Sequence, residues 1–378
     1  MTIDLLAATF SEDPYREYDR IRDAAGVYYD KAAQSFVVAD YEGVNQLVGQ
    51  SAISPYSYLW EVESVEAKQP LIPGESPFIL ASASAPKGLP GLEGIKSIIE
   101  KNSEDLLSRI SSGLRFDLVR QFSSLLPYGI FADITGISRT DIPRLQHWHA
   151  AFLDMLKNIE RNPDIAVNSE NSRSQMRRYF DGVSEYNDRD NAPFEWSDLG
   201  ERRDPALGAL LMCGGMHFEE AFARYMLYLA NNKAVRKEVL SNDEVALNVL
   251  REIYRCFAPR PIIMVQNHED ILLKGIEIPK SSRINLLVSA ANRDETVFSA
   301  GATPEPYAES GNGPMVFTGS QFPLSNVSNE YHVYAARVSN LIAVIASRQI
   351  FTRFSDLEFP ESANWVRSRS LVAQLART

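Results

Sequence analysis

The chain of 378 residues is 45% hydrophobic and 23% charged, which is typical of a globular protein with ample apolar material for a large core. Its net charge of -11 argues against a protein that binds nucleic acid or anionic membranes, because both functions need a basic surface. No apolar run approaches the ~20 residues that span a bilayer, and the N-terminus lacks the features of a signal peptide, so we expect a cytoplasmic protein.

The N-terminal part of the chain predicts a helix, a hairpin and a second helix. Residues 13–26 have helical periodicity, with Tyr15 and Tyr18 on one face and a glycine at the end. Residues 27–40 contain two short β-like runs around a polar turn, and residues 41–50 return to a helical pattern.

The middle of the chain predicts helix after helix, interrupted by glycine and proline. The segments are 95–112, 116–137 and 142–160. Residues 204–232 are apolar almost all round and would form a core helix about 40 Å long at ~1.5 Å per residue, interrupted at Gly214 and Gly215.

The C-terminal half adds a helix at 244–259 and strands with a tight turn at 268–294. No Gly/Ser-rich or Pro-rich linker divides the chain. The pattern therefore predicts one domain, residues 1–378, that is mostly α with small antiparallel β-sheets.

The cysteines and histidines do not predict a metal site. Cys213 and Cys256 are far apart in the sequence, and His147 and His149 lie two residues apart on a helix, so their side chains point to different faces. The sequence contains no zinc spacing, phosphate loop, dinucleotide fingerprint or nucleophile elbow. By motifs alone, the chain does not reveal its chemistry.

The order of the elements and several sequence words resemble a bacterial cytochrome P450 along essentially the whole chain. Residues 13–48 resemble the N-terminal helix, hairpin and B helix of that family, and residues 131–152 resemble its E–F region. The most specific piece is "EDILLKGIEIPKSSRINLLVSAANRDETVF", residues 269–298. The resemblance implies the cytochrome P450 fold.

The resemblance also assigns structural roles. Glu252 and Arg255 match the Glu-x-x-Arg pair that anchors the family's haem-ligand loop, although an i,i+3 pair is also compatible with a weak surface ion pair. Asn292, Arg293 and Asp294 belong to a stretch that resembles the family, and the resemblance assigns them to the same structural scaffold. The arginine that completes the family's network has no evident counterpart after residue 298.

The positions that contact haem in the family carry unsuitable residues here. Counting back from Arg337 places Glu330 at the ligand cysteine, and no cysteine follows Cys256. The haem-contact positions in the other regions are Gly88, Leu92, Phe218 and Val265. A carboxylate cannot replace the thiolate that drives O–O cleavage.

We therefore expect a chain without a cofactor, in which Met216, His217 and Phe218 lean into the former haem space or the ligand loop collapses. The alternative is haem b with unusual ligation, for which His332 could supply an imidazole. A solvent-facing histidine at a helix start is the simpler interpretation of His332.

The resemblance extends to P450-like auxiliary proteins that bind and activate a deoxysugar glycosyltransferase in natural-product biosynthesis. A partner that prefers the active state of a transferase shifts its population and needs no chemistry of its own. We thus expect a protein partner, no nucleic acid and no membrane; the sequence does not indicate the oligomeric state.

Two other functions stay open. One is a module that recruits oxygenases, similar to the P450-like domains of glycopeptide assembly lines. The other is an enzyme in its own right, either a monooxygenase with non-cysteine haem ligation or a catalyst in a remodelled pocket. Its acid and base would be His217 with Glu219 or Glu220, although a core histidine and solvated glutamates are the simpler interpretation of these residues.

Overall fold

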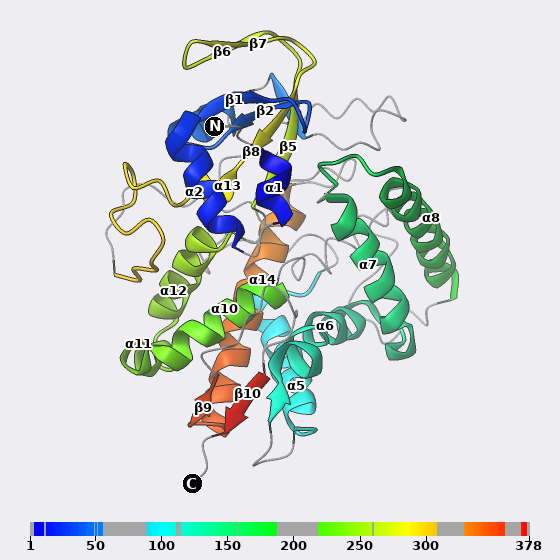
Figure 1. Cartoon of the computed structure of the whole chain (residues 1–378). Coiled ribbons are helices and arrows are strands. Elements are labelled where there is room, and N and C mark those ends of the chain that lie inside the picture. The colour runs from blue at the N-terminus through cyan, green and yellow to red at the C-terminus, as the bar shows by residue number, and fades with distance from the viewer. Residues whose placement is uncertain are drawn as a thin grey trace. The chain divides into compact units, whose positions relative to one another are not determined.

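The computed structural model describes residues 4–10, 13–48, 50, 52–55, 89–110, 115–156, 158–186, 218–258, 261–307, 329–359 and 372–375 (Figure 1). The chain divides into two compact units, each built from separate stretches of sequence. Unit 1 comprises Met1–Ser76, Ala150–Ser172 and Glu252–Ser325, and unit 2 comprises Pro77–His149, Arg173–Arg251 and Asn326–Thr378. That residues 1–378 act as one domain stays a prediction. Among the described residues, no helix has the length and apolarity needed to cross a membrane.

Unit 1 is built on a five-stranded sheet with the order β1-β2-β8-β5-β3. The strands are β1 (Val27–Asp30), β2 (Ser35–Val38), β3 (Ile53–Pro55), β5 (Ile263–Asn267) and β8 (Arg283–Leu286), and a separate hairpin pairs β6 (Ile271–Leu273) with β7 (Ile276–Ile278). The predicted hairpin at 27–40 is confirmed, because Val27 pairs with Val38 and Asp30 with Ser35. The sheet is antiparallel except where β2 runs parallel to β8.

Helices α1 (Leu5–Phe10), α2 (Pro14–Ala25), α3 (Tyr41–Val48) and α13 (Val288–Ala291) accompany this sheet. The side chain of Asp13 caps α2 by accepting from the amide of Arg16, and Pro14 occupies the first turn. The helix ends at Gly26, whose φ of 52° suits glycine, and a Cβ there would lie 2.9 Å from Asp40 Oδ2. The predicted helix at 13–26 is thus confirmed.

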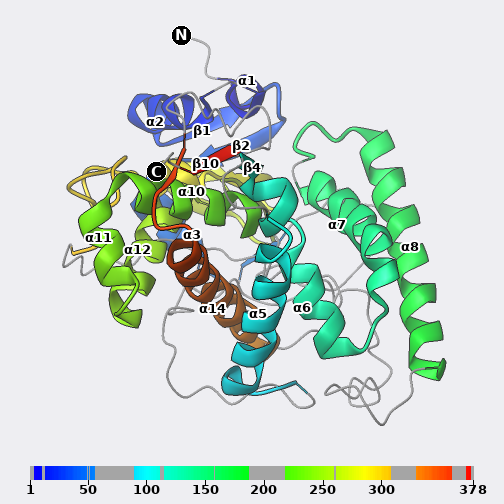
Figure 2. The same ribbon diagram turned by 90° about the horizontal axis from the view of Figure 1, so that it is seen from below.

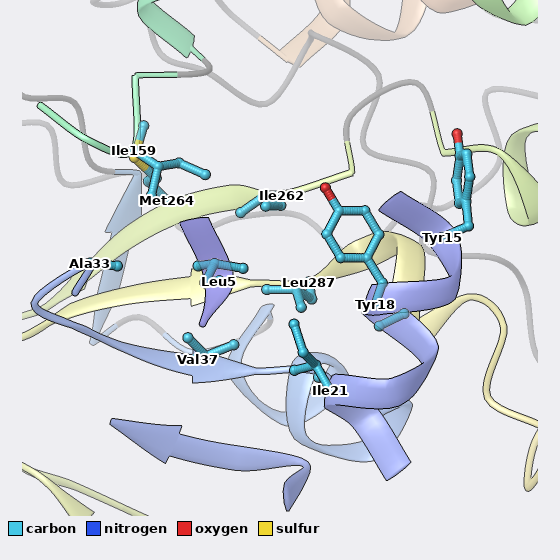
Figure 3. Close-up of a cluster of buried hydrophobic side chains, with 12 residues drawn as sticks. Leu5, Tyr15, Tyr18, Ile21, Ala33, Val37, Ile159, Ile262, Met264 and Leu287 are labelled. Atoms are coloured by element: carbon cyan, nitrogen blue, oxygen red, sulfur yellow. The ribbon is translucent and has the colours of Figure 1, made fainter. Parts of the chain in front are cut away.

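The core of unit 1 lies between α2 and the sheet (Figure 3). Tyr15, Tyr18 and Ile21 recur at helical spacing and are buried. They join a cluster that also contains Leu5, Ala33, Val37, Ala39, Ile159, Ile262, Met264, Leu287 and Ala290. The apolar stripe seen in the sequence therefore holds α2 on the sheet.

Two segments of unit 1 differ from the sequence prediction. β5 was not predicted, because residues 262–265 form an unbroken apolar run; such a run suits a strand that is covered on both faces of the sheet, and residues 263–265 are all buried. Residues 288–291, expected as strand, form the short helix α13. The amide of Leu287 still bonds to the carbonyl of Val38, and the chain then turns, with the amide of Asn292 bonded to the carbonyl of Val288.

The Glu252–Arg255 pair lies at the end of α12 (Asp243–Cys256) and is buried, so the surface ion-pair interpretation is wrong. The guanidinium of Arg255 donates to Glu252 Oε2 at 2.9 Å and to the carbonyls of Asn292, Gly301 and Thr303 at 3.0, 2.7 and 2.9 Å. One side chain thereby fixes two loop segments that are far from it in the sequence.

The Glu252 carboxylate is also bound by a backbone amide. The N–H of Glu305 donates to Glu252 Oε2 at 2.9 Å, so the carboxylate has a second partner besides Arg255. Gly301 is needed for this packing, because a Cβ at that position would collide with the carbonyl oxygen of Arg293. The network is complete without an additional cation.

The shared word at 292–294 ties the same loop to α2 and α3. Arg293 forms an ion pair with Asp19 at 3.1 Å and stacks over Tyr15, with 5.1 Å from the guanidinium carbon to the ring centroid. Asp294 Oδ2 accepts from the amide of Tyr41 at 3.0 Å. These residues stabilise unit 1.

Unit 2 is mostly helical. Its helices are α5 (Leu92–Leu107), the π-helical turn η1 (Val119–Ser123), α6 (Leu126–Thr135), the short 3-10 turn η2 (Arg139–Asp141), α10 (Phe218–Asn231), α11 (Lys233–Val239) and α14 (Asn329–Arg353). α7 (Ile142–Leu156), α8 (Pro163–Tyr186) and α12 contribute residues to both units. A small sheet pairs β10 (Val372–Leu375) with β4 (Phe116–Asp117) and β9 (Leu357–Glu358). Of the long helix predicted at 204–232, the structure describes only α10.

His147 and His149 on α7 differ in exposure, as their spacing predicted. His147 is exposed, whereas His149 is buried and its Nδ1 lies 2.6 Å from the hydroxyl of Tyr128. Burial lowers the pKa of His149 to about 4. The two histidines do not form a metal pair.

We predict that unit 2 loses stability in mild acid through His149. Its pKa in the folded state lies below the unfolded value of 6.5, so the unfolded chain takes up a proton first. The stabilisation is complete above pH 6.5 and declines as the pH falls towards 4, by about 3 kcal/mol in all at ~1.4 kcal/mol per pKa unit. Urea unfolding at several pH values measures it.

The variant H149Q should flatten this part of the stability curve, because a neutral amide replaces the titrating ring. H147Q, on the same helix but exposed, is the control and should leave the curve unchanged. Equal pH dependence in wild type and H149Q would contradict the assignment.

We also predict that R255A destabilises the protein by about 3–5 kcal/mol, because it leaves the buried Glu252 carboxylate and several carbonyls without their donor. R353A removes an exposed ion pair with Glu104 and should cost less than about 1 kcal/mol. Urea midpoints of the two variants compare the effects; similar losses would refute the role of Arg255.

Candidate functional site

The positions that the resemblance assigned to cofactor contacts lie on four elements. Leu92 is the first residue of α5, Phe218 the first of α10, Val265 lies within β5, and Glu330 is in the first turn of α14. Gly88 lies outside the described residues. Val265 belongs to unit 1, whereas Leu92, Phe218 and Glu330 belong to unit 2.

The starts of α5 and α14 lie at the same end of unit 2. The hydroxyl of Tyr334 donates to the carbonyl of Pro90 at 2.7 Å, just before α5 begins. Farther along, Gln349 Nε2 donates to the carbonyl of Glu100 at 3.2 Å. The two helices therefore run side by side in the same direction, as Figure 2 shows. This arrangement brings the start of α5, with Leu92, close to the first turns of α14.

Pro90 fits this arrangement because α5 starts after it. The helix begins at Leu92, behind the N-cap residue Gly91, which has no side-chain cap. A proline cannot sit inside a helix without loss of a hydrogen bond.

Phe218 packs within an aromatic row. Its ring stacks on that of Phe222 with 5.0 Å between centroids, and Phe222 stacks on Phe122 of η1 at 6.1 Å. Phe218 is 3% exposed. Met216 and His217, which were expected to fill space beside it, lie outside the described residues, so that expectation stays untested.

The proposed acid and base residues on α10 are ordinary first-turn glutamates. Glu219 and Glu220 are half-buried, and Glu220 lies 3.9 Å from Arg224 one turn along the helix. Carboxylates at a helix N-terminus are favoured by the helix dipole. Their partner His217 lies outside the described residues.

Val265 is a fully buried strand residue. It pairs with Ile284 of β8 on one side and with Pro55 of β3 on the other. The position where the family has an arginine is therefore occupied by an aliphatic side chain inside the sheet. It can pack against apolar groups but cannot bind a carboxylate.

Arg337 is a residue that sequence reasoning missed. It served only to set the register, yet its side chain on α14 is buried, and Nε and Nη1 have no hydrogen-bond partner among the described residues. Burial lowers the pKa of the guanidinium, although arginine stays protonated at neutral pH. A buried, unpaired cation is costly, which suits a position that binds an anion.

The cysteines offer no thiolate for a ligand near α14. Cys256 is buried at the end of α12, with Sγ 4.0 Å from the carbonyl oxygen of Gly301. Burial raises the pKa of its thiol to about 12, so it stays protonated. Cys213 lies outside the described residues, and residues 257–378 contain no cysteine. Within the described residues, no three His, Cys, Asp or Glu side chains are placed to hold a metal ion.

Curated proteins with similar sequences are bacterial P450s or biosynthetic enzymes. Pulcherriminic acid synthase of Bacillus subtilis is 22% identical over 91% of this chain and 89% of its own length. The polyketide biosynthesis cytochrome P450 PksS of the same organism is 22% identical over 72% of this chain and 67% of its own. No family model matches the chain.

Solved structures show the same fold. P450BioI in complex with an acyl carrier protein superimposes with a TM-score of 0.75 over 98% of this chain and 100% of that one, at 18% identity. A mutant of P450 EryK in complex with erythromycin B gives a TM-score of 0.71 over 96% of both chains, at 16% identity. The predicted fold, mostly α with small sheets in the cytochrome P450 arrangement, is confirmed.

These similarities correct one prediction. The expectation that the chain has no cofactor is wrong by this comparison, because the similar proteins are haem-binding P450 enzymes. The residues of this chain nevertheless do not fit a thiolate-ligated haem, since Cys256 is a buried, protonated thiol and no cysteine follows it. We derive no reaction step through the group.

Sequence similarity over most of the chain and the shared architecture lead to one conclusion. The protein is a homologue of the cytochrome P450 superfamily and has the P450 fold.

Proposed function

We propose that the chain is a P450-fold auxiliary protein of natural-product biosynthesis that binds and activates a partner enzyme, with a deoxysugar glycosyltransferase as the best candidate. One observation carries the proposal. The buried Glu252–Arg255 pair, which matches the pair that anchors the family's ligand loop, is present, whereas residues 257–378 contain no cysteine to serve as the ligand.

The scaffold is kept at an energetic cost. A buried Arg255 and Glu252 must be desolvated, and only the full set of hydrogen bonds offsets that penalty. A chain that needed only an arbitrary stable core could replace the pair with apolar residues. Its presence indicates that the shape of the surrounding loops is under constraint, which is what a docking protein requires.

The ligand position carries different chemistry. By the register from Arg337, Glu330 stands where the family has its cysteine, and the structure places it in the first turn of α14. A carboxylate does not donate electron density as a thiolate does, so it would not promote O–O cleavage. Leu92 and Val265 likewise replace groups that bind haem carboxylates. Monooxygenation through an iron thiolate is therefore not the function that these residues support.

The biosynthetic setting comes from the similar proteins. PksS is named for polyketide biosynthesis, and EryK was crystallised with erythromycin B. P450BioI was crystallised with an acyl carrier protein, so at least one protein of this fold docks a protein partner. We propose that this chain likewise acts in natural-product biosynthesis and binds a protein partner.

Activation by such a protein would be allosteric. If the chain binds the active conformation of a transferase better than the inactive one, the ratio of the two affinities sets the largest possible activation. A tenfold ratio corresponds to about 1.4 kcal/mol, which a small set of interface contacts can supply. The catalytic base and the sugar-nucleotide site then belong to the transferase.

The test is the initial rate of a purified deoxysugar glycosyltransferase with its nucleotide-sugar donor and acceptor, with and without this chain as isolated, with bound haem quantified beforehand. We expect the rate to rise at least tenfold and to saturate with the concentration of the chain. E330Q should activate equally, because the proposal gives Glu330 no chemical role. No rate change with any candidate transferase, or a product formed by the chain alone with a reductant, would overturn the proposal.

A further inference from the structure

A second surface feature of unit 2 lies away from the elements discussed above. A groove of about 560 Å³, open to solvent, runs between α5 and the end of α6. Ser97, Ile98 and Lys101 line one side, and Ala132 and Asp133 lie on the other. Neither the proposed activation nor the fold comparison accounts for it.

A polar network is built into the wall of this groove. Asp133 accepts from Arg139 Nη2 at 2.7 Å and from Asn102 Nδ2 at 2.9 Å. Asn102 Oδ1 in turn accepts from Arg139 at 2.8 Å, and Asn102 is 2% exposed. Although burial raises the pKa of Asp133, the hydrogen bonds from Arg139 and Asn102 hold it below its usual range. The carboxylate is therefore charged, and it fixes the arginine in place.

The backbone leaves room for this network at one glycine. A Cβ at Gly129 would lie 2.6 Å from Asn102 Oδ1 and 3.4 Å from Arg139 Nη1. Asp133 also lies in the last turn of α6, where the helix dipole disfavours a negative charge and no basic residue of the helix offsets it. The arrangement thus holds two cations, Arg139 and Lys101, next to one carboxylate.

The two cations have donors to spare. Lys101 Nζ lies 3.6 Å from Asp133, beyond a good hydrogen bond, and it makes none with the described residues. Arg139 makes both of its described hydrogen bonds through Nη2 and is 44% exposed. Of the residues that line the groove, Lys101 and Asp133 carry opposite charges. Arg139, which is bonded to Asp133 but lies outside the lining, adds one positive charge at the edge of the groove, on a chain whose total charge is -11.

We propose that this groove binds acidic side chains of a protein partner, with Lys101 of the lining and Arg139 at its edge as the receiving cations. A small-molecule site would enclose most of its ligand. This groove is open to solvent, and its charged groups are partly exposed, which matches the polar rim of a protein interface. The inference rests on the proposed function only in taking the partner to be the activated enzyme.

The first experiment needs no partner enzyme. A fluorescein-labelled hexaglutamate peptide is titrated with wild type, K101E and K96E, and binding is followed by anisotropy at low and at moderate salt. Lys96 is the matched control, because it lies on α5 outside the groove lining and is paired with Glu93. We expect wild type and K96E to bind the peptide with similar, salt-weakened affinity and K101E to bind at least tenfold more weakly.

Absence of peptide binding by wild type, or equal affinity of K101E and wild type, would overturn the groove assignment. The second experiment repeats the transferase activation with K101E and K96E. Reduced activation by K101E alone supports the groove as part of the interface. Full activation by K101E refutes the groove while the proposed function stands, and peptide binding without any activation by wild type refutes only the proposed function.

Discussion

The buried Arg255 guanidinium is the interaction on which unit 1 depends. It joins the end of α12 to the segment after α13 and to the loop around Gly301, and it does so through backbone carbonyls. Backbone acceptors place few demands on the surrounding side chains. Glu252 is likewise held by the backbone, since the amide of Glu305 donates to its carboxylate.

The residues that hold the loops resemble the family, whereas the residues at the haem-contact positions do not. Residues of the stretch that resembles the family's scaffold, including Arg293 and Asp294, hold loops in place here. Residues that would contact a haem are aliphatic or aromatic at Leu92, Val265 and Phe218. Similar sequences and structures nevertheless belong to haem-binding proteins. Whether this chain binds haem is therefore a different property from whether a cysteine thiolate ligates the iron.

Periodicity predicted the regular elements well, because α2 and the β1–β2 hairpin bury one face and expose the other. It failed for β5, since a strand whose side chains are buried on both faces of the sheet has no alternation to detect. The candidate site was harder to predict from the sequence than the helices and strands. Arg337 carries no motif, and only the structure shows that its guanidinium is buried with Nε and Nη1 lacking a hydrogen-bond partner among the described residues. The groove at Lys101 lies between two helices that are separate in the sequence, so no pattern within a single segment could predict it.

The central claim is that this P450 fold works without an iron thiolate. The most direct measurement is the carbon monoxide difference spectrum of the reduced protein after reconstitution with haem, with the haem content determined on the same sample. The account predicts no thiolate-type band, because Cys256 is a buried, protonated thiol and no cysteine follows it. A stable thiolate band in proportion to the bound haem would contradict it.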